Sequence, residues 1–245
     1  MTGEHIVRAY DDELKHLDNL VARMGGLAEA QLAAATEALN RRDRDAASRI
    51  ADRDSEIDAL EAEINTFALR VLALRQPLAE DLRTVVAALK TAGDLERIGD
   101  YVRNMANRTG ALANAPTVGD TALTISRMGR LVQSMIKNVL DAYVRRDVQL
   151  ADDVRDCDQE VDQLHTSLFR ELLTYMKEDP RTITTCTHLL FIAKNIERMG
   201  DHVTDIAEHV HAMILGEEPA PGRPKGDLSS FTVVGPGAQE EEPVA

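Results

Sequence analysis

The feature that most constrains the fold of this chain is an internal repeat. Three blocks of sequence recur in the same order, the first two at an offset of 104 residues and the third at an offset of 101. A repeat of this length indicates two copies of one supersecondary unit, each with a hydrophobic face of its own. The blocks are residues 24–27, 54–60 and 94–100, which match residues 128–131, 158–164 and 195–201.

Each copy is expected to form three long helices. Aromatic residues make up only 3% of the chain, and its Ala- and Leu-rich composition favours helix over strand. Pro77 and Pro180 occupy equivalent places in the two copies, and proline cannot continue a helix, so each second helix ends just before its proline. The expected helices span about 10–41, 44–75 and 80–112 in the first copy, and 121–145, a segment ending before 179, and 181–215 in the second.

Apolar residues in these segments step by threes and fours, which is typical of helical bundles. They include Ile57, Leu60, Ile64 and Leu74. The predicted fold class is therefore all-α, with two tandem three-helix bundles, residues 1–115 and 116–215. Five of the eight prolines lie after residue 218, and this composition predicts a flexible, disordered acidic tail over residues 216–245.

Charge and composition exclude several classes of protein. The formal net charge of −14 argues against nucleic acid as the main partner, because a phosphate-binding surface must be basic. Two cysteines far apart in sequence do not make a disulfide framework. The N-terminus has no signal-peptide pattern, and no apolar run is long enough to cross a bilayer. We therefore expect a soluble, cytoplasmic protein.

The third helix of each copy carries a ladder of polar residues spaced by four. These side chains share one helix face opposite an apolar stripe, so we expect them to face outward or into a shallow groove. Their oxygens suit hard cations such as Mg²⁺, Mn²⁺ or iron. A solvated acidic face with local ion pairs explains the same spacing, and whether acids of the second helix join the ladders stays open. The ladders are Glu96, Asp100 and Asn104 in the first copy, and Glu197, Asp201 and Asp205 in the second.

Two motifs give the sequence a resemblance to a known family. The stretch Leu74-Arg75-Gln76-Pro77-Leu78-Ala79-Glu80-Asp81-Leu82-Arg83, followed by Asp94-Leu95-Glu96-Arg97-Ile98-Gly99-Asp100, resembles the signature of the PhoU family. The second copy repeats it as Glu197-Arg198-Met199-Gly200-Asp201-His202. The resemblance covers residues 10–215 and implies two three-helix bundles and a cytoplasmic, non-enzymatic regulator of phosphate uptake.

The resemblance also implies partners and ligands. It implies an adaptor between the ATPase of the phosphate ABC transporter, PstB, and the sensor histidine kinase PhoR, which represses the phosphate-starvation response and meets the membrane only through its partners. It implies metal ions, iron or Mg, Mn and Zn, on Glu/Asp-xxx-Asp motifs: Glu96 with Asp100, Glu197 with Asp201, and Asp201 with Asp205. No organic cofactor is expected. Because Asn104 is a weaker ligand than Asp205, the first-copy site should hold metal less tightly.

Other functions remain as alternatives. Glu13 with His16 and Glu208 with His211 have the Glu-x-x-His spacing of di-iron bundles, so a metal-storage or oxidase bundle stays open. A helical scaffold with no link to phosphate is a further possibility. The sequence lacks a nucleophile elbow or a phosphate-binding glycine loop, and no catalytic residue is assigned. Homodimerisation is expected only because it is common among soluble proteins.

Overall fold

A computed structural model describes residues 2–217, 219, 227, 229 and 232. Most of the predicted flexible tail, residues 216–245, therefore lies outside the described residues. Within them the chain is almost entirely helical and contains no strand, which confirms the all-α prediction. The helices are α1 (Thr2–Arg41), α2 (Arg44–Asp52), α3 (Asp54–Arg75), α4 (Ala79–Leu112), α5 (Thr121–Arg145), α6 (Val148–Glu178), the short 3₁₀ helix η1 (Pro180–Thr182) and α7 (Ile183–Leu215).

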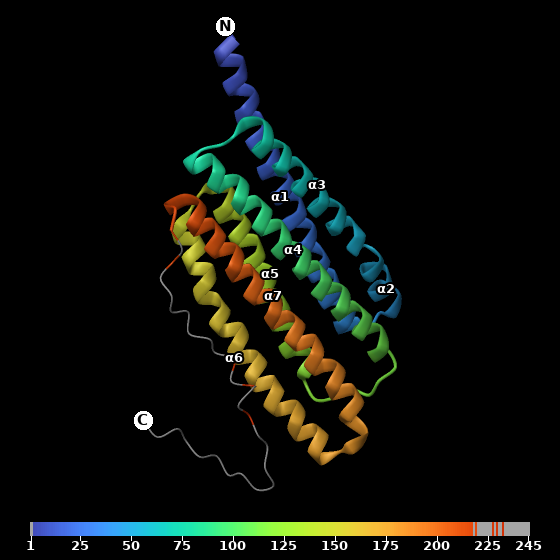
Figure 1. The fold of residues 1–245 in the computed structure, drawn as a ribbon. Helices are drawn as coiled ribbons and strands as arrows, with labels where there is room; N and C mark the ends of the chain where they lie inside the picture. Colours follow the sequence, from blue (N-terminus) through green and yellow to red (C-terminus); the bar gives the residue numbers. More distant parts are fainter. Residues whose placement is uncertain (1, 218, 220–226, 228, 230–231, 233–245) are drawn as a thin grey trace, which may run out of the picture.

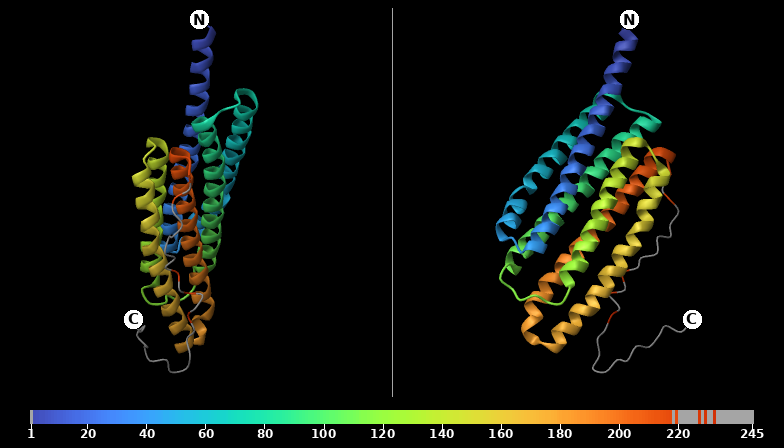
Figure 2. Two further views of the ribbon diagram at one scale, coloured as in Figure 1. Left: turned by 60° about the vertical axis from the view of Figure 1, so that its left-hand side comes forward. Right: turned by 180° about the vertical axis from the view of Figure 1, so that it is seen from behind.

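The two bundles lie side by side, as Figures 1 and 2 show. The first consists of α1 to α4 and the second of α5 to α7. Helix α4 packs against α7, and α1 packs against α5, so each bundle buries one face against the other. Helices α2 and α3 cover one side of this central group, and α6 covers the opposite side.

The repeat is visible in how the helices begin and end. Arg42 and Arg146, each at the end of the first helix of its copy, have left-handed φ angles of 53° and 56°. The next residues, Asp43 and Asp147, cap the following helices, because each carboxylate accepts a hydrogen bond from a backbone N–H three residues on. Equivalent sequence therefore produces equivalent local structure in both copies.

Two helices differ from the expectation. Helix α1 begins at Thr2 and not near residue 10. The second helix of the first copy, predicted as a single segment, is divided into α2 and α3 at Arg53. The ψ angle of Arg53 is −1°, away from helical values. Its carbonyl oxygen accepts a hydrogen bond of 3.2 Å from Gln31 Nε2 of α1. The equivalent α6 is continuous, so this break belongs to the first copy alone.

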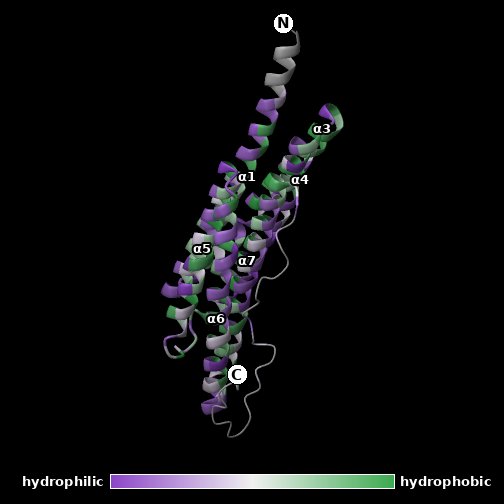
Figure 3. Ribbon diagram, turned by 90° about the vertical axis from the view of Figure 1, so that its left-hand side faces the viewer, coloured by the Kyte–Doolittle hydropathy of each residue, from purple (hydrophilic) through white to green (hydrophobic). Residues whose placement is uncertain are grey.

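The core follows most of the predicted apolar stripes. Leu95, Ile98, Val102 and Met105 of α4 are fully buried, and Figure 3 shows hydrophilic and hydrophobic residues mixed along the helices. The prediction is wrong for Leu74, which is 71% exposed because it lies in the last turn of α3, where the chain leaves the bundle. None of the described helices combines the length and the apolar character that a membrane span requires.

Candidate functional site

Each bundle brings a carboxylate of its second helix against the third helix at a glycine. A Cβ atom on Gly99 would lie 2.9 Å from Ile57 Cδ1 and 3.5 Å from Asp54 Oδ1. A Cβ atom on Gly200 would lie only 2.6 Å from Asp158 Oδ1. The missing side chains thus leave room mainly for Ile57 in the first bundle and for Asp158 in the second. The sequence left open whether these acids join the ladders; the structure places Asp54 and Asp158 against the glycines of the third helices.

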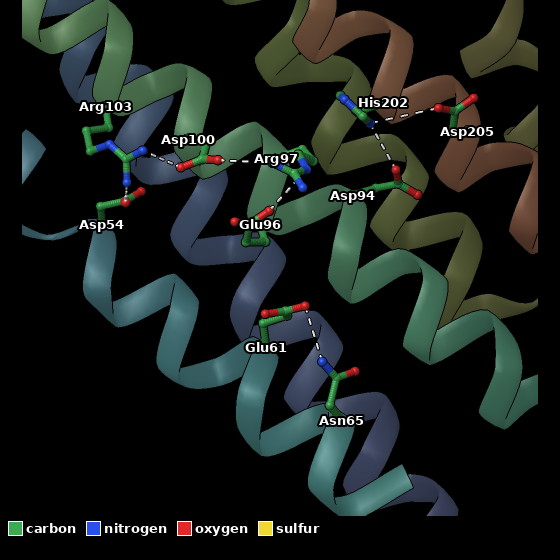
Figure 4. A network of polar contacts seen from close by, with 10 residues as sticks. All are labelled: Asp54, Glu61, Asn65, Asp94, Glu96, Arg97, Asp100, Arg103, His202 and Asp205. Carbon is green, nitrogen blue, oxygen red and sulfur yellow. Dashed lines mark hydrogen bonds and ion pairs between the residues drawn. The ribbon is translucent and has the colours of Figure 1, made fainter. Parts of the chain in front are cut away.

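In the first bundle two arginines connect the carboxylates, as Figure 4 shows. Arg103 forms ion pairs with both Asp54 and Asp100. Arg97 lies 3.5 Å from Glu96 and from Asp100, so the ion pair of Arg97 with Asp100 expected for a solvated acidic face is present. Part of the negative charge of this group is therefore already offset within the protein.

Burial and neighbouring negative charges nevertheless raise the pKa of two first-copy acids. Burial raises the pKa of Asp54, and the charge of Asp58 adds to this while Arg103 opposes it. Burial also raises the pKa of Glu96, with a further contribution from Asp100. Carboxylates that are partly buried beside one another hold protons, or accept a cation, more readily than isolated ones.

The first residue of the second-copy ladder is deeply buried. Glu197 is only 5% exposed, so the expectation that the ladder faces outward or into a shallow groove is wrong for this residue. Helix α7 packs against α4, α5 and α6, and these contacts bury much of its surface. Glu197 Oε1 accepts a hydrogen bond of 2.7 Å from Lys194, whereas Oε2 is buried without a hydrogen-bond partner among the described residues. Burial raises the pKa of Glu197 to about 7.

Other polar groups surround Glu197. Asp158 and Asp162 of α6 are 1% and 3% exposed. Asp227, which belongs to the predicted tail, lies 3.0 Å from Lys194 Nζ and 3.3 Å from His165 Nδ1. Sequence reasoning missed His165 and Asp227. The repeat could have found His165, because it stands where the first copy has Glu61, but nothing in the tail sequence indicated Asp227.

The carboxylate groups of the two copies differ in the positively charged side chains beside them. The first copy has Arg103 between its two helices, and the second has Thr204 at the matching position. The hydroxyl of Thr204 donates to the backbone carbonyl of Asp201. The second copy therefore has no arginine at the position where Arg103 pairs with Asp54 and Asp100 in the first copy.

Asp205 lies apart from the rest of its ladder. Its carboxylate is 3.8 Å from His202 Nδ1, and the charges that most affect its pKa are Asp94 and His202. Asp94, on α4, contacts His202 Nδ1 at 2.9 Å and His209 Nε2 at 3.0 Å. The structure therefore keeps Glu197 near Asp201 and brings Asp205 into a different cluster, between the bundles.

The Glu-x-x-His pairs have separate partners. Glu13 accepts two hydrogen bonds from Arg75, and the His16 ring packs against Phe67 with 4.7 Å between ring centroids. Glu208 lies 3.5 Å from Arg155, while a ring nitrogen of His211 contacts a backbone carbonyl. The residues of each pair contact different neighbouring groups, so this arrangement does not favour one shared di-iron site.

Comparison with known proteins places the whole body of the chain in one group. The PhoU domain model matches residues 21–109 and 125–210, one segment in each copy. The chain is 50% identical over 227 residues to the phosphate-specific transport system accessory protein PhoU homolog of Caulobacter vibrioides, covering 93% of this chain and 99% of that protein. The homolog of the same name from Xylella fastidiosa is 49% identical over 228 residues, covering 93% of this chain and 94% of that protein.

Two solved structures have the same fold. The crystal structure of PhoU from Pseudomonas aeruginosa has a TM-score of 0.82 and 36% sequence identity, covering 85% of this chain and 100% of that chain. The phosphate transport system regulatory protein PhoU from Streptococcus pneumoniae has a TM-score of 0.81 and 27% identity, covering 86% of this chain and 99% of that chain. The similarity therefore extends over both bundles and nearly the full length of each relative.

Proposed function

Because this chain belongs to the PhoU family, we propose that it is a cytoplasmic accessory regulator of phosphate-specific transport. In this proposal the protein is a non-enzymatic adaptor that binds the transporter ATPase PstB and the sensor kinase PhoR, and represses the phosphate-starvation response when phosphate is plentiful. The observation that carries the proposal is the match of both copies, in order, to relatives named as transport accessory proteins.

The turn between α3 and α4 supports an adaptor role. Leu74 and Leu78, within the stretch that carries the family resemblance, are 71% and 80% exposed. Arg75 between them is held by its bidentate ion pair with Glu13 of α1. Exposed apolar side chains next to a charged side chain that is held in place are typical of protein-binding surfaces. We propose that this turn contacts the transporter ATPase.

A binding experiment with matched variants tests this contact. The Leu74→Asp/Leu78→Asp double variant of the full chain should lose at least tenfold in affinity for purified PstB, because a carboxylate cannot be buried in an apolar interface. Leu123→Asp is the control, since Leu123 is 66% exposed at the start of α5, in the other bundle. Equal binding by the wild type and the double variant would contradict the proposed contact.

The regulatory role is tested in cells. Deletion of the gene should raise expression of phosphate-starvation reporters at high phosphate, and the wild-type chain should restore repression. Unchanged reporters would favour the scaffold with no link to phosphate. We also propose that two copies of the chain associate as a homodimer. Sedimentation of the purified protein measures this association.

We also propose that the carboxylate groups bind metal ions. Asp158, Asp162, Glu197 and Asp201 supply only oxygen, which suits iron in a hard environment, Mg²⁺ or Mn²⁺. The buried Glu197 Oε2, which has no hydrogen-bond partner among the described residues, would be a ligand of such an ion. A bound ion would offset the repulsion among these acids, and it would also supply the positive field that an acidic protein needs to attract phosphate.

Metal content measured after purification tests the two groups separately. Glu197→Gln/Asp201→Asn should remove more metal than Glu96→Gln/Asp100→Asn, because Arg97 and Arg103 already pair with the first-copy acids. Metal content equal to that of the wild type in both variants would rule out binding at the ladders.

A further inference from the structure

A polar cluster of a different kind lies between the two bundles. Asp94 reaches it from α4, and His202, Asp205 and His209 reach it from α7. The three α7 residues are spaced by three and four positions, so they share one face of the helix. Figure 4 shows His202 between Asp94 and Asp205. Unlike the ladders, this cluster offers two imidazole rings in addition to carboxylates.

The geometry of the cluster is close to that of a metal centre. One possible ligand atom each from Asp94, His202 and Asp205 lie within 4.8 Å of one another. The ligand atoms around a tetrahedral zinc ion are about 3.3–3.5 Å apart, from bond lengths of roughly 2.0–2.1 Å. His209 lies next to these three residues, with its Nε2 3.0 Å from the second oxygen of Asp94, so rotation of its ring would bring a fourth ligand to the ion. Small rotations of side chains that already face one another would complete the site.

The surroundings hold the ligands in place and leave one side open. The side chains of Asp94, His202 and His209 are 15%, 23% and 20% exposed, whereas Asp205 is 51% exposed. The ring of Tyr101 lies against that of His202, with 5.7 Å between centroids. A cavity of about 350 Å³ between α4 and α7 includes His209 in its lining. An ion therefore has access from solvent to ligands that are otherwise packed.

We propose that Asp94, His202, Asp205 and His209 bind a zinc-like divalent transition-metal ion that joins the two bundles. Two nitrogen and two carboxylate ligands favour such ions over Mg²⁺ or Ca²⁺. The site is separate from the ladders within each bundle, and it depends neither on metal binding there nor on the regulatory function. Because the ion contacts both α4 and α7, its binding stabilises the packing of one copy against the other.

Titration of the metal-free, full-length protein tests the proposal. Zn²⁺ is added in a calorimeter, and Co²⁺ is used as a visible-absorption probe of nitrogen ligation. We expect the wild type to bind Zn²⁺ at this site, and His202→Ala and Asp94→Asn each to lose at least tenfold in affinity together with the Co²⁺ absorption. His211→Ala is the matched control, since it removes a histidine of the same helix whose ring nitrogen contacts a backbone carbonyl.

The thermal midpoint separates binding from folding. Each variant is first melted without metal to establish that it folds, and then with Zn²⁺; the rise in midpoint seen for the wild type and His211→Ala should be absent in His202→Ala and Asp94→Asn. Wild-type affinity in both variants would overturn the proposal. Loss of Zn²⁺ binding only in Glu197→Gln/Asp201→Asn would assign the ion to the ladder and overturn it as well. Zn²⁺ binding by the purified protein is measured independently of the reporter assay, so failure of the regulatory proposal would not change this result.

Discussion

At the scale of single residues, two glycines decide how the acids of each bundle meet. Gly99 and Gly200 are interior to long helices, where glycine is unfavourable. The sequence showed that they stand beside the ladders and that a close approach is possible there. It could not show that the approaching atoms belong to Ile57 and Asp54 at Gly99, and to Asp158 at Gly200, because the neighbouring helix is far away in the chain.

Replacing these glycines with alanine gives a first prediction. In Gly200→Ala the new Cβ atom would lie 2.6 Å from Asp158 Oδ1, so the free energy of unfolding should fall by about 1–3 kcal/mol. Gly93→Ala is the control, because no atom lies within 4 Å of its Cβ position, and it should raise the free energy by about 0.5–1 kcal/mol. Urea denaturation measures both. Equal stabilisation by the two alanines would contradict the close approach.

At the scale of helices, the sequence predicted most boundaries because caps and breakers act locally. Asp43, Asp147, Pro77 and Pro180 each set a helix end through their own backbone or a neighbouring N–H. The break at Arg53 was not predicted, because Gln31, which contacts its carbonyl, lies on another helix. The exposure of Leu74 was not predicted either, because the apolar periodicity of one helix does not show where a neighbouring helix ends.

The ion pair between α1 and the end of α3 gives a prediction that depends on pH. Arg75 lowers the pKa of Glu13 below its ordinary value of 4.5, so the pair stabilises the fold above that value, and this stabilisation is lost as the pH falls through the lowered pKa. Glu13→Gln should therefore be less stable than the wild type at pH 7, and the difference should shrink to zero in acid. Glu63→Gln removes an exposed carboxylate of α3 and is the control in chemical denaturation; an equal pH-dependent loss of stability in both variants would contradict the prediction.

At the scale of the whole molecule, the two copies share a core. Tyr143 of α5 is fully buried, and its hydroxyl donates a hydrogen bond of 2.9 Å to Asp18 of α1. Arg146 donates to the same carboxylate, and Arg83 of α4 donates to the carbonyl of Met213 in α7. The division into residues 1–115 and 116–215 describes the repeat, and these contacts cross it.

We therefore expect the protein to unfold in one cooperative transition. Calorimetric and van't Hoff enthalpies should agree, and circular dichroism and tyrosine fluorescence should report the same midpoint. Tyr143→Phe should lower the free energy of unfolding by about 1–3 kcal/mol, since it removes a buried hydrogen bond to a charged group, and should shift the transition as a whole. Two separated transitions, with only one sensitive to Tyr143→Phe, would show instead that the copies fold independently.

The sequence by itself determined the helices, their duplication and the family, because helix periodicity, capping and repeated motifs are properties of residues close together in the chain. It also indicated the ladders as candidate metal ligands. Only the tertiary structure decided that Glu197 is buried, that Arg103 connects two acids, and that Asp205 meets Asp94 and two histidines rather than its own ladder. These outcomes depend on which helices pack against each other, and side-chain contacts between helices distant in sequence leave no periodic signal in either one.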